Sequence, residues 1–179
     1  INPLSEISET NPLFDSRLQH EGVTCVACHL REGALEGPHE VQAPHPTRAV
    51  TDFASAERCE RCHQIIPPPF PFSRSDRPLT DTHAEWKEWM KTTGRSESCT
   101  DCHMPKIERA SAPGAPVRSG RMHTFPGAWD DELVVSGVEV GDIRLVDGII
   151  QVPITNLAGH RFPSGEPARA LIIEATVYD

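Results

Sequence analysis

The arrangement of the cysteines constrains this chain more than any other feature of its sequence. All six cysteines fall into three copies of the pattern Cys-x-x-Cys-His. The copies are Cys25-Val-Ala-Cys28-His29, Cys59-Glu-Arg-Cys62-His63 and Cys99-Thr-Asp-Cys102-His103. Three matches that use every cysteine are not a chance occurrence, so one kind of chemistry should explain all three.

This pattern is the attachment signature of c-type haem. Two thiols at this spacing reach the two vinyl groups on one edge of a porphyrin, and the adjacent imidazole turns onto the iron as the proximal ligand. Disulfides, paired zinc sites and redox-active cysteine pairs are alternatives, but none of them requires a histidine after every second cysteine. The sequence therefore predicts three haem c groups held by the six cysteines, with His29, His63 and His103 as proximal iron ligands.

The other histidines outnumber the axial positions that remain. Nine histidines are present, so six are left for three irons. Only three methionines compete, and Met104 directly follows His103 and cannot reach the far face of the same haem. The surplus predicts bis-histidine ligation, with low reduction potentials and no open iron site. We favour His20, His45 and His123 as distal ligands over His160, His83 and His39.

The composition predicts a fold with little regular structure. Only 37% of the residues are hydrophobic, against nearly half in an average globular domain. Seventeen prolines and twelve glycines indicate many turns. We therefore expect a haem-dominated, mostly irregular fold with short α-helices in residues 1–127, a triheme cytochrome c domain. Residues 128–179 should form a small antiparallel β-domain or cap.

Local patterns place some elements within these regions. Residues 82–93 should form a helix that begins with a Thr82–Glu85 capping box and ends at Gly94, and 110–120 should be a loop. Asp147-Gly148 is typical of a hairpin turn. The segments expected to be β-rich are 133–140, 143–146, 149–155 and 170–178.

The net charge and the hydropathy of the chain exclude some classes of binding partner. A formal net charge of −9 argues against binding to nucleic acid or to an anionic membrane. No apolar stretch approaches the roughly 18–20 residues that span a bilayer. The first ten residues lack the features of a signal peptide, so we expect a mature chain whose signal was removed, or a piece of a longer protein. The last segment reads as a strand without a following turn, which leaves a continuation open.

Several segments resemble bacterial multihaem cytochromes c, in the broad group around the tetrahaem cytochromes and hydroxylamine oxidoreductase. The segments that carry the resemblance are 20–29, Glu85-Trp86-Lys87, 99–105 and His123-Thr-Phe-Pro-Gly127, and 156–165 resembles the β-cap that follows the haems in some of these proteins. The resemblance implies a periplasmic or extracellular protein. It also implies distal roles for His20, which precedes a haem motif, and for His123. Three haems are fewer than the enzymes of the group carry, and no lysine variant of the motif is present.

Two functions are compatible with these features. The first is electron transfer between redox partner proteins, alone or within a larger complex or filament, with no catalytic residue. The second is an enzyme or a small-ligand sensor, in which one haem lacks a strong distal ligand.

Overall fold

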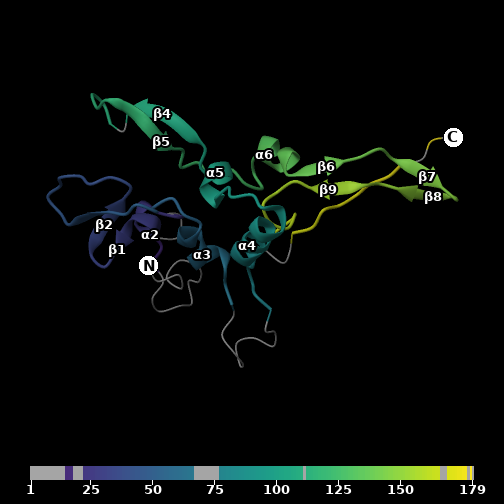
Figure 1. Cartoon of the computed structure of the whole chain (residues 1–179), viewed down its shortest axis with the longest axis horizontal. Coiled ribbons are helices and arrows are strands. Elements are labelled where there is room, and N and C mark those ends of the chain that lie inside the picture. Colours follow the sequence, from purple (N-terminus) through teal and green to yellow (C-terminus); the bar gives the residue numbers. More distant parts are fainter. Residues whose placement is uncertain are drawn as a thin grey trace. The chain divides into compact units, whose positions relative to one another are not determined.

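The computed structural model divides the chain into two compact units, residues 1–54 and 55–179 (Figure 1). The residues described are 15–17, 22–66, 77–110, 112–165, 169–176 and 178. The sequence predicts a different boundary, between a haem-binding domain that ends at residue 127 and a β-rich region that begins at residue 128. The division into compact units does not test this boundary, which stays a prediction.

The described part of the first unit contains one short helix and a three-stranded sheet. Its elements are α2 (Cys25–His29), β1 (Leu30–Arg31), β2 (Ala34–Gly37) and β3 (Thr47–Ala49). β1 and β2 are antiparallel, and β3 pairs parallel with β2. Arg48 on β3 donates from Nε to the Glu36 carboxylate on β2 at 2.9 Å. This charge-assisted bond supports the pairing of β2 with β3.

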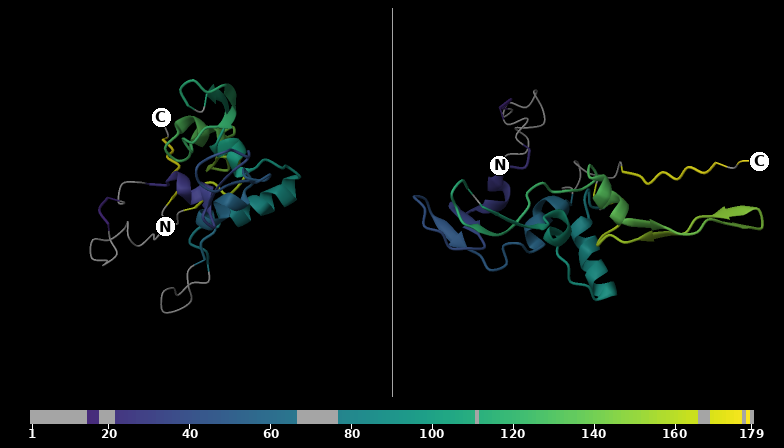
Figure 2. Two further views of the ribbon diagram at one scale, coloured as in Figure 1. Left: turned by 90° about the vertical axis from the view of Figure 1, so that its left-hand side faces the viewer. Right: turned by 90° about the horizontal axis from the view of Figure 1, so that it is seen from above.

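The second unit combines short helices with two-stranded antiparallel sheets. Its described helices are α3 (Glu57–His63), α4 (Thr82–Thr93), α5 (Cys99–His103) and α6 (Asp131–Ser136). Its strands are β4 (Lys106–Ala110), β5 (Val117–Arg121), β6 (Val138–Val140), β7 (Arg144–Val146), β8 (Ile149–Gln151) and β9 (Ile154–Asn156). β4 pairs with β5, β6 with β9, and β7 with β8. The pairs β6–β9 and β7–β8 follow one another as a long ribbon that extends from the helices of this unit (Figures 1 and 2).

Helix α4 confirms the predicted helix, and Gly94 ends it in the left-handed conformation with φ of 70°. The predicted capping box is wrong, because Asp81 is the N-cap and no side-chain cap bond forms. The side chain of Gln64, directly after α3, forms hydrogen bonds with the first turn of α4 instead. Its Oε1 accepts from the Ala84 N–H at 3.0 Å, and its Nε2 donates to Asp81 Oδ1 at 2.8 Å. The start of α4 is therefore fixed by a residue far away in sequence.

The predicted fold class is wrong. The described residues form a mixed α/β arrangement of short helices and small sheets, with strands in residues 1–127 as well as after them. The segment predicted as a loop at 110–120 holds the end of β4, at Ala110, and most of β5, from Val117, so that prediction is wrong at these positions. Backbone N–H and C=O groups pair between short neighbouring segments even where side chains show no alternating pattern, and composition therefore underestimated the regular structure.

The outcomes for the C-terminal elements differ. Asp147 and Gly148, with φ of 51° and 77°, form the predicted hairpin turn between β7 and β8. The predicted strand at 133–136 is wrong, because Asp130 Oδ1 accepts from the Leu133 N–H at 2.9 Å and caps the start of α6. The predicted strand at 170–178 is wrong as well, since the described residues there carry no strand.

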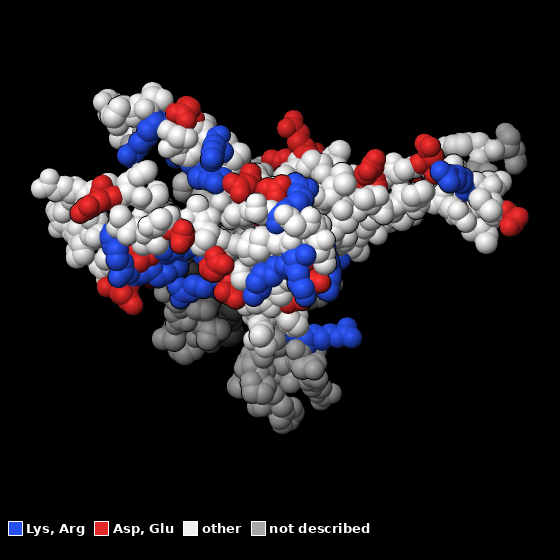
Figure 3. Space-filling model, in the orientation of Figure 1, with Lys and Arg blue, Asp and Glu red and all other residues white. Residues whose placement is uncertain are grey.

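Few apolar side chains are shielded from solvent. In the part of the chain that the structure describes, Ala56 is the only buried hydrophobic residue, whereas Val23 and Ile66 are 77% and 67% exposed. Lys and Arg side chains alternate with Asp and Glu on the face shown in Figure 3. None of the described helices combines the length and the apolar character needed to span a bilayer, as expected.

Candidate functional site

Each Cys-x-x-Cys-His motif lies on a short helix whose last residue is the motif histidine. α2 and α5 span their motifs from the first cysteine to the histidine, and α3 begins two residues before Cys59 and ends at His63. Residues three and four positions apart lie on the same face of a helix. Each helix therefore presents two thiols and one imidazole from one side, as covalent attachment of a haem requires.

Backbone carbonyls orient the imidazoles of the first and third motifs. His29 Nδ1 lies 2.7 Å from the Glu36 carbonyl oxygen on β2, and His103 Nδ1 lies 2.6 Å from the Pro126 carbonyl oxygen. A carbonyl can only accept, so Nδ1 carries the proton in both rings and Nε2 keeps its lone pair. This is the arrangement that holds a metal-binding histidine in one tautomer and orientation. Both residues fit the proximal role predicted for them.

The helix of the third motif is braced from two sides. Ser98 and Asp101 form a capping box at the start of α5, with Ser98 N–H donating to Asp101 Oδ2 at 2.9 Å. Arg121 on β5 donates to the Thr100 carbonyl at 2.7 Å and to the Met104 carbonyl at 3.2 Å. The same guanidinium donates to Asp101 Oδ1 at 2.8 Å and lowers the pKa of that carboxyl. Hairpin β4–β5 thereby fixes the orientation of α5.

The second and third motifs lie together in the second unit. A side-chain hydrogen bond joins Cys59 and Cys99, which raises the pKa of the Cys59 thiol and lowers that of Cys99. Loss of solvent contact lowers the pKa of the His63 imidazole, and the neighbouring His103 and His160 lower it further. The first cysteines of two motifs are therefore in contact, with both motif imidazoles close by.

Two of the candidate distal histidines, the half-buried His160 and the buried His83, lie in this unit. The rings of His160 and His103 have centroids 6.2 Å apart, with planes 15° from parallel. His83 on α4 is 3% exposed and stacks on Trp86 at 5.4 Å. Within the described residues neither ring nitrogen of His83 makes a hydrogen bond, although Glu60 Oε1 lies 3.3 Å from Nδ1. A buried imidazole without a hydrogen bond is costly unless another group binds it.

The described histidines favoured as distal ligands, His45 and His123, are exposed to solvent. His123 is exposed, with Nδ1 2.9 Å from the Arg121 carbonyl and its ring edge-on to Phe125 at 6.1 Å. His45 is exposed in the loop before β3, as is His39. His20 lies outside the described residues. The distal roles of these histidines stay predictions.

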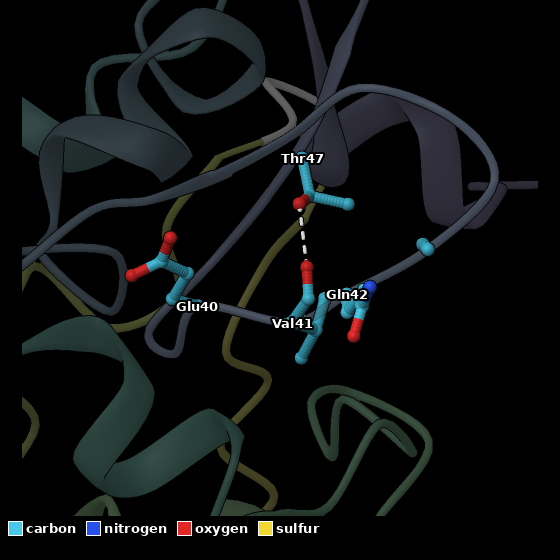
Figure 4. A pocket seen from close by; sticks show the side chains of 5 residues that line it. Glu40, Val41, Gln42 and Thr47 are labelled. Carbon is cyan, nitrogen blue, oxygen red and sulfur yellow. Dashed lines mark hydrogen bonds between the residues drawn. The ribbon is translucent and has the colours of Figure 1, made fainter.

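The loop that carries His39 and His45 also forms a hollow on the first unit. Its lining residues are Glu40, Val41, Gln42, Ala43 and Thr47 (Figure 4). Thr47 Oγ1 donates to the Val41 carbonyl at 2.8 Å and closes the loop across the hollow. The lining contains a single carboxylate and no nucleophile or imidazole, so it brings no catalytic group to the motifs.

Sequence reasoning missed the groups that position the motifs. The carbonyls of Glu36 and Pro126 could not be found, because a backbone acceptor leaves no signal in a sequence. Arg121 gave no signal either, since its role depends on the register of β4 and β5. The capping role predicted for Glu85 is wrong. Its carboxylate accepts from Ser164 Oγ at 2.6 Å and from the Arg161 N–H at 3.1 Å instead of capping α4.

The described side chains include no group of three or more His, Cys, Asp or Glu residues placed to bind a metal ion by themselves. Comparison of the chain with models of known protein families, with curated proteins and with solved structures finds no match. The three motifs and the geometry around them are therefore the features that indicate a function.

Proposed function

We propose that this chain is a multihaem cytochrome c that transfers electrons through three covalently bound haem c groups. The observation that carries the proposal is that every cysteine belongs to a helical Cys-x-x-Cys-His motif. Two of the three motif histidines, His29 and His103, donate from Nδ1 to a carbonyl and present Nε2 for a metal. The haem iron would supply one-electron chemistry, and the chain's residues would attach and orient it.

Contact between two motifs supports electron transfer in particular. Cys59 and Cys99 share a hydrogen bond, so macrocycles attached at these residues would be direct neighbours. Electrons pass readily between cofactors that are close together. Chemistry on a bound substrate would need an open iron, whereas the buried imidazole of His83 and the half-buried imidazole of His160 offer further ligands in the same unit.

Apolar side chains near the motifs also suit large apolar cofactors. Val23 and Val26 beside the first motif are 77% and 42% exposed, and Ile66 beside the second is 67% exposed. Covering such side chains with a macrocycle would contribute about 25 cal/mol per Å² of apolar surface removed from water. We further propose a location in the periplasm or outside the cell, where haem c is attached in bacteria, and redox proteins as partners.

Haem content tests this proposal directly. The chain should be produced in a host that attaches haem c, and its haem should be quantified per chain from the alkaline pyridine spectrum. We expect three haems, and two in a Cys25→Ala/Cys28→Ala control. A chain that carries zinc or disulfides in place of haem would refute the proposal.

Carbon monoxide separates electron transfer from the alternative. If all three reduced irons have strong ligands on both sides, the reduced spectrum should not change when carbon monoxide is added. A change that corresponds to one haem would identify an open site, and the enzyme or sensor function would then be preferred.

A further inference from the structure

The imidazole rings of His103 and His160 lie close together with nearly parallel planes. Their ring centroids are 6.2 Å apart, and their planes differ by 15°. A bond between a metal and imidazole nitrogen is about 2 Å long, so two imidazoles on opposite sides of one metal ion have centroids about 6 Å apart once the ring radii are added. The observed separation is the one that a shared iron would impose.

The protonation of the two rings points the same way. His103 Nδ1 lies 2.6 Å from the Pro126 carbonyl oxygen, and His160 Nδ1 lies 2.8 Å from the Arg161 carbonyl oxygen. Both rings must carry their proton on Nδ1, so each has an unprotonated Nε2. Two such rings cannot form a hydrogen bond with each other through Nε2. A metal ion with two axial positions matches both lone pairs.

The loop that carries His160 is fixed to helix α4. Glu85 on this helix accepts from Ser164 Oγ at 2.6 Å and from the Arg161 N–H at 3.1 Å, and its side chain is 8% exposed. On the other side, Asn156 Nδ2 donates to the His160 carbonyl at 2.7 Å. His160 is therefore held by bonds on both sides of it in the chain, as an axial ligand should be.

Close packing fixes the same loop. A Cβ atom on Gly159 would lie 3.6 Å from the ring of Trp89 on α4, so the backbone next to His160 lies against the helix. Thr82 Oγ1 and Ser164 Oγ are 3.0 Å apart and add a third hydrogen bond to the same helix.

We propose that His160 is the distal iron ligand of the haem attached at Cys99 and Cys102, opposite His103. The inference rests on the proposed function, because it presupposes that this haem is present. The sequence favours His20, His45 and His123 over His160 as distal ligands and does not assign any of them to a particular haem. The proposal gives His160 this role at the third motif, and it makes the loop after β9 part of the third haem site.

The test uses the full chain loaded with haem and compares His160→Ala with a matched His39→Ala control, in which an exposed histidine outside the favoured set is removed. Haem per chain is measured first, and we expect three in both variants. In the reduced state, carbon monoxide should bind one haem of His160→Ala and none of His39→Ala. Added imidazole should restore the original spectrum of His160→Ala by occupying the open position.

A second variant covers the case in which His160→Ala does not fold. His160→Met keeps an axial ligand, so its third haem should stay low-spin while its reduction potential rises. If His160→Ala or His160→Met leaves the spectrum and the potentials unchanged, the two rings form only an aromatic pair and the inference is wrong. A haem count other than three in the unmodified chain would refute the proposed function rather than this assignment.

Discussion

The first and third motifs begin alike and differ in what faces their histidines. Both form a five-residue helix, and a backbone carbonyl orients both imidazoles through Nδ1. The ring of His29 then meets Phe53 at 4.7 Å, whereas the ring of His103 meets a second imidazole, His160. In the proposed cytochrome, each motif would therefore supply the attachment and the proximal ligand, and distant segments would determine what faces that ligand.

The supports of the two helices differ as well. α2 has no side-chain bond at its N-cap, Thr24, and relies on the hairpin β1–β2 that follows it. α5 has a capping box and is held by Arg121 from hairpin β4–β5. Removal of a single stabilising side chain should therefore change the stability of α5 more than that of α2.

Removal of whole motifs should give the largest effect. Cys25→Ala/Cys28→Ala and Cys99→Ala/Cys102→Ala should each lower the haem content by about one third, because thioether bonds hold the cofactor. Only the second variant should also change the spectrum and potential of the haem at the second motif, since Cys59 contacts Cys99. Pyridine haemochrome assays and redox titration measure both effects, and equal disturbance of that haem by the two variants would contradict the comparison.

Arg121 should contribute an intermediate effect that is specific to the third motif. Arg121→Ala leaves the carbonyls of Thr100 and Met104 without their donor, so we expect the free energy of unfolding to fall by about 1–2 kcal/mol. Guanidinium titration measures this change. Arg95→Ala is the matched control, because Arg95 pairs with Glu97 at an exposed position. An equal loss in both variants would show that Arg121 does not brace α5.

Phe53 should give the smallest effect, confined to the first motif. Phe53→Leu removes the ring contact with His29 and should cost about 1 kcal/mol, with the haem content unchanged. Small shifts in the low-spin electron paramagnetic resonance signal should appear for one haem. Phe125→Leu, which removes the edge-on contact with His123, is the control. A change in the signals of all three haems after Phe53→Leu would show that the first motif is not an independent site.

Strong local signals explain which elements were predictable. The end of helix α4 at Gly94 and the Asp147-Gly148 turn were predictable because glycine caps and turn chemistry act within a few residues. The motif helices are too short to show a helical hydrophobic periodicity, so the sequence indicated their chemistry but not their exact bounds. Strands β1–β5 were missed because each is short and lacks alternation. The partner of His103 was not separable from five other histidines, because its position depends on the contact of the 156–164 loop with α4.

The contact between Cys59 and Cys99 also bears on how the chain matures. Before haem is attached, a thiol oxidant could join these two residues in a disulfide, with two electrons and two protons passing to the oxidant. Such a bond would take one cysteine from each of two motifs and block both attachment reactions at once. In the proposed cytochrome, haem attachment would therefore have to precede folding of this unit, or a reductant would have to keep the two thiols reduced until both haems are in place.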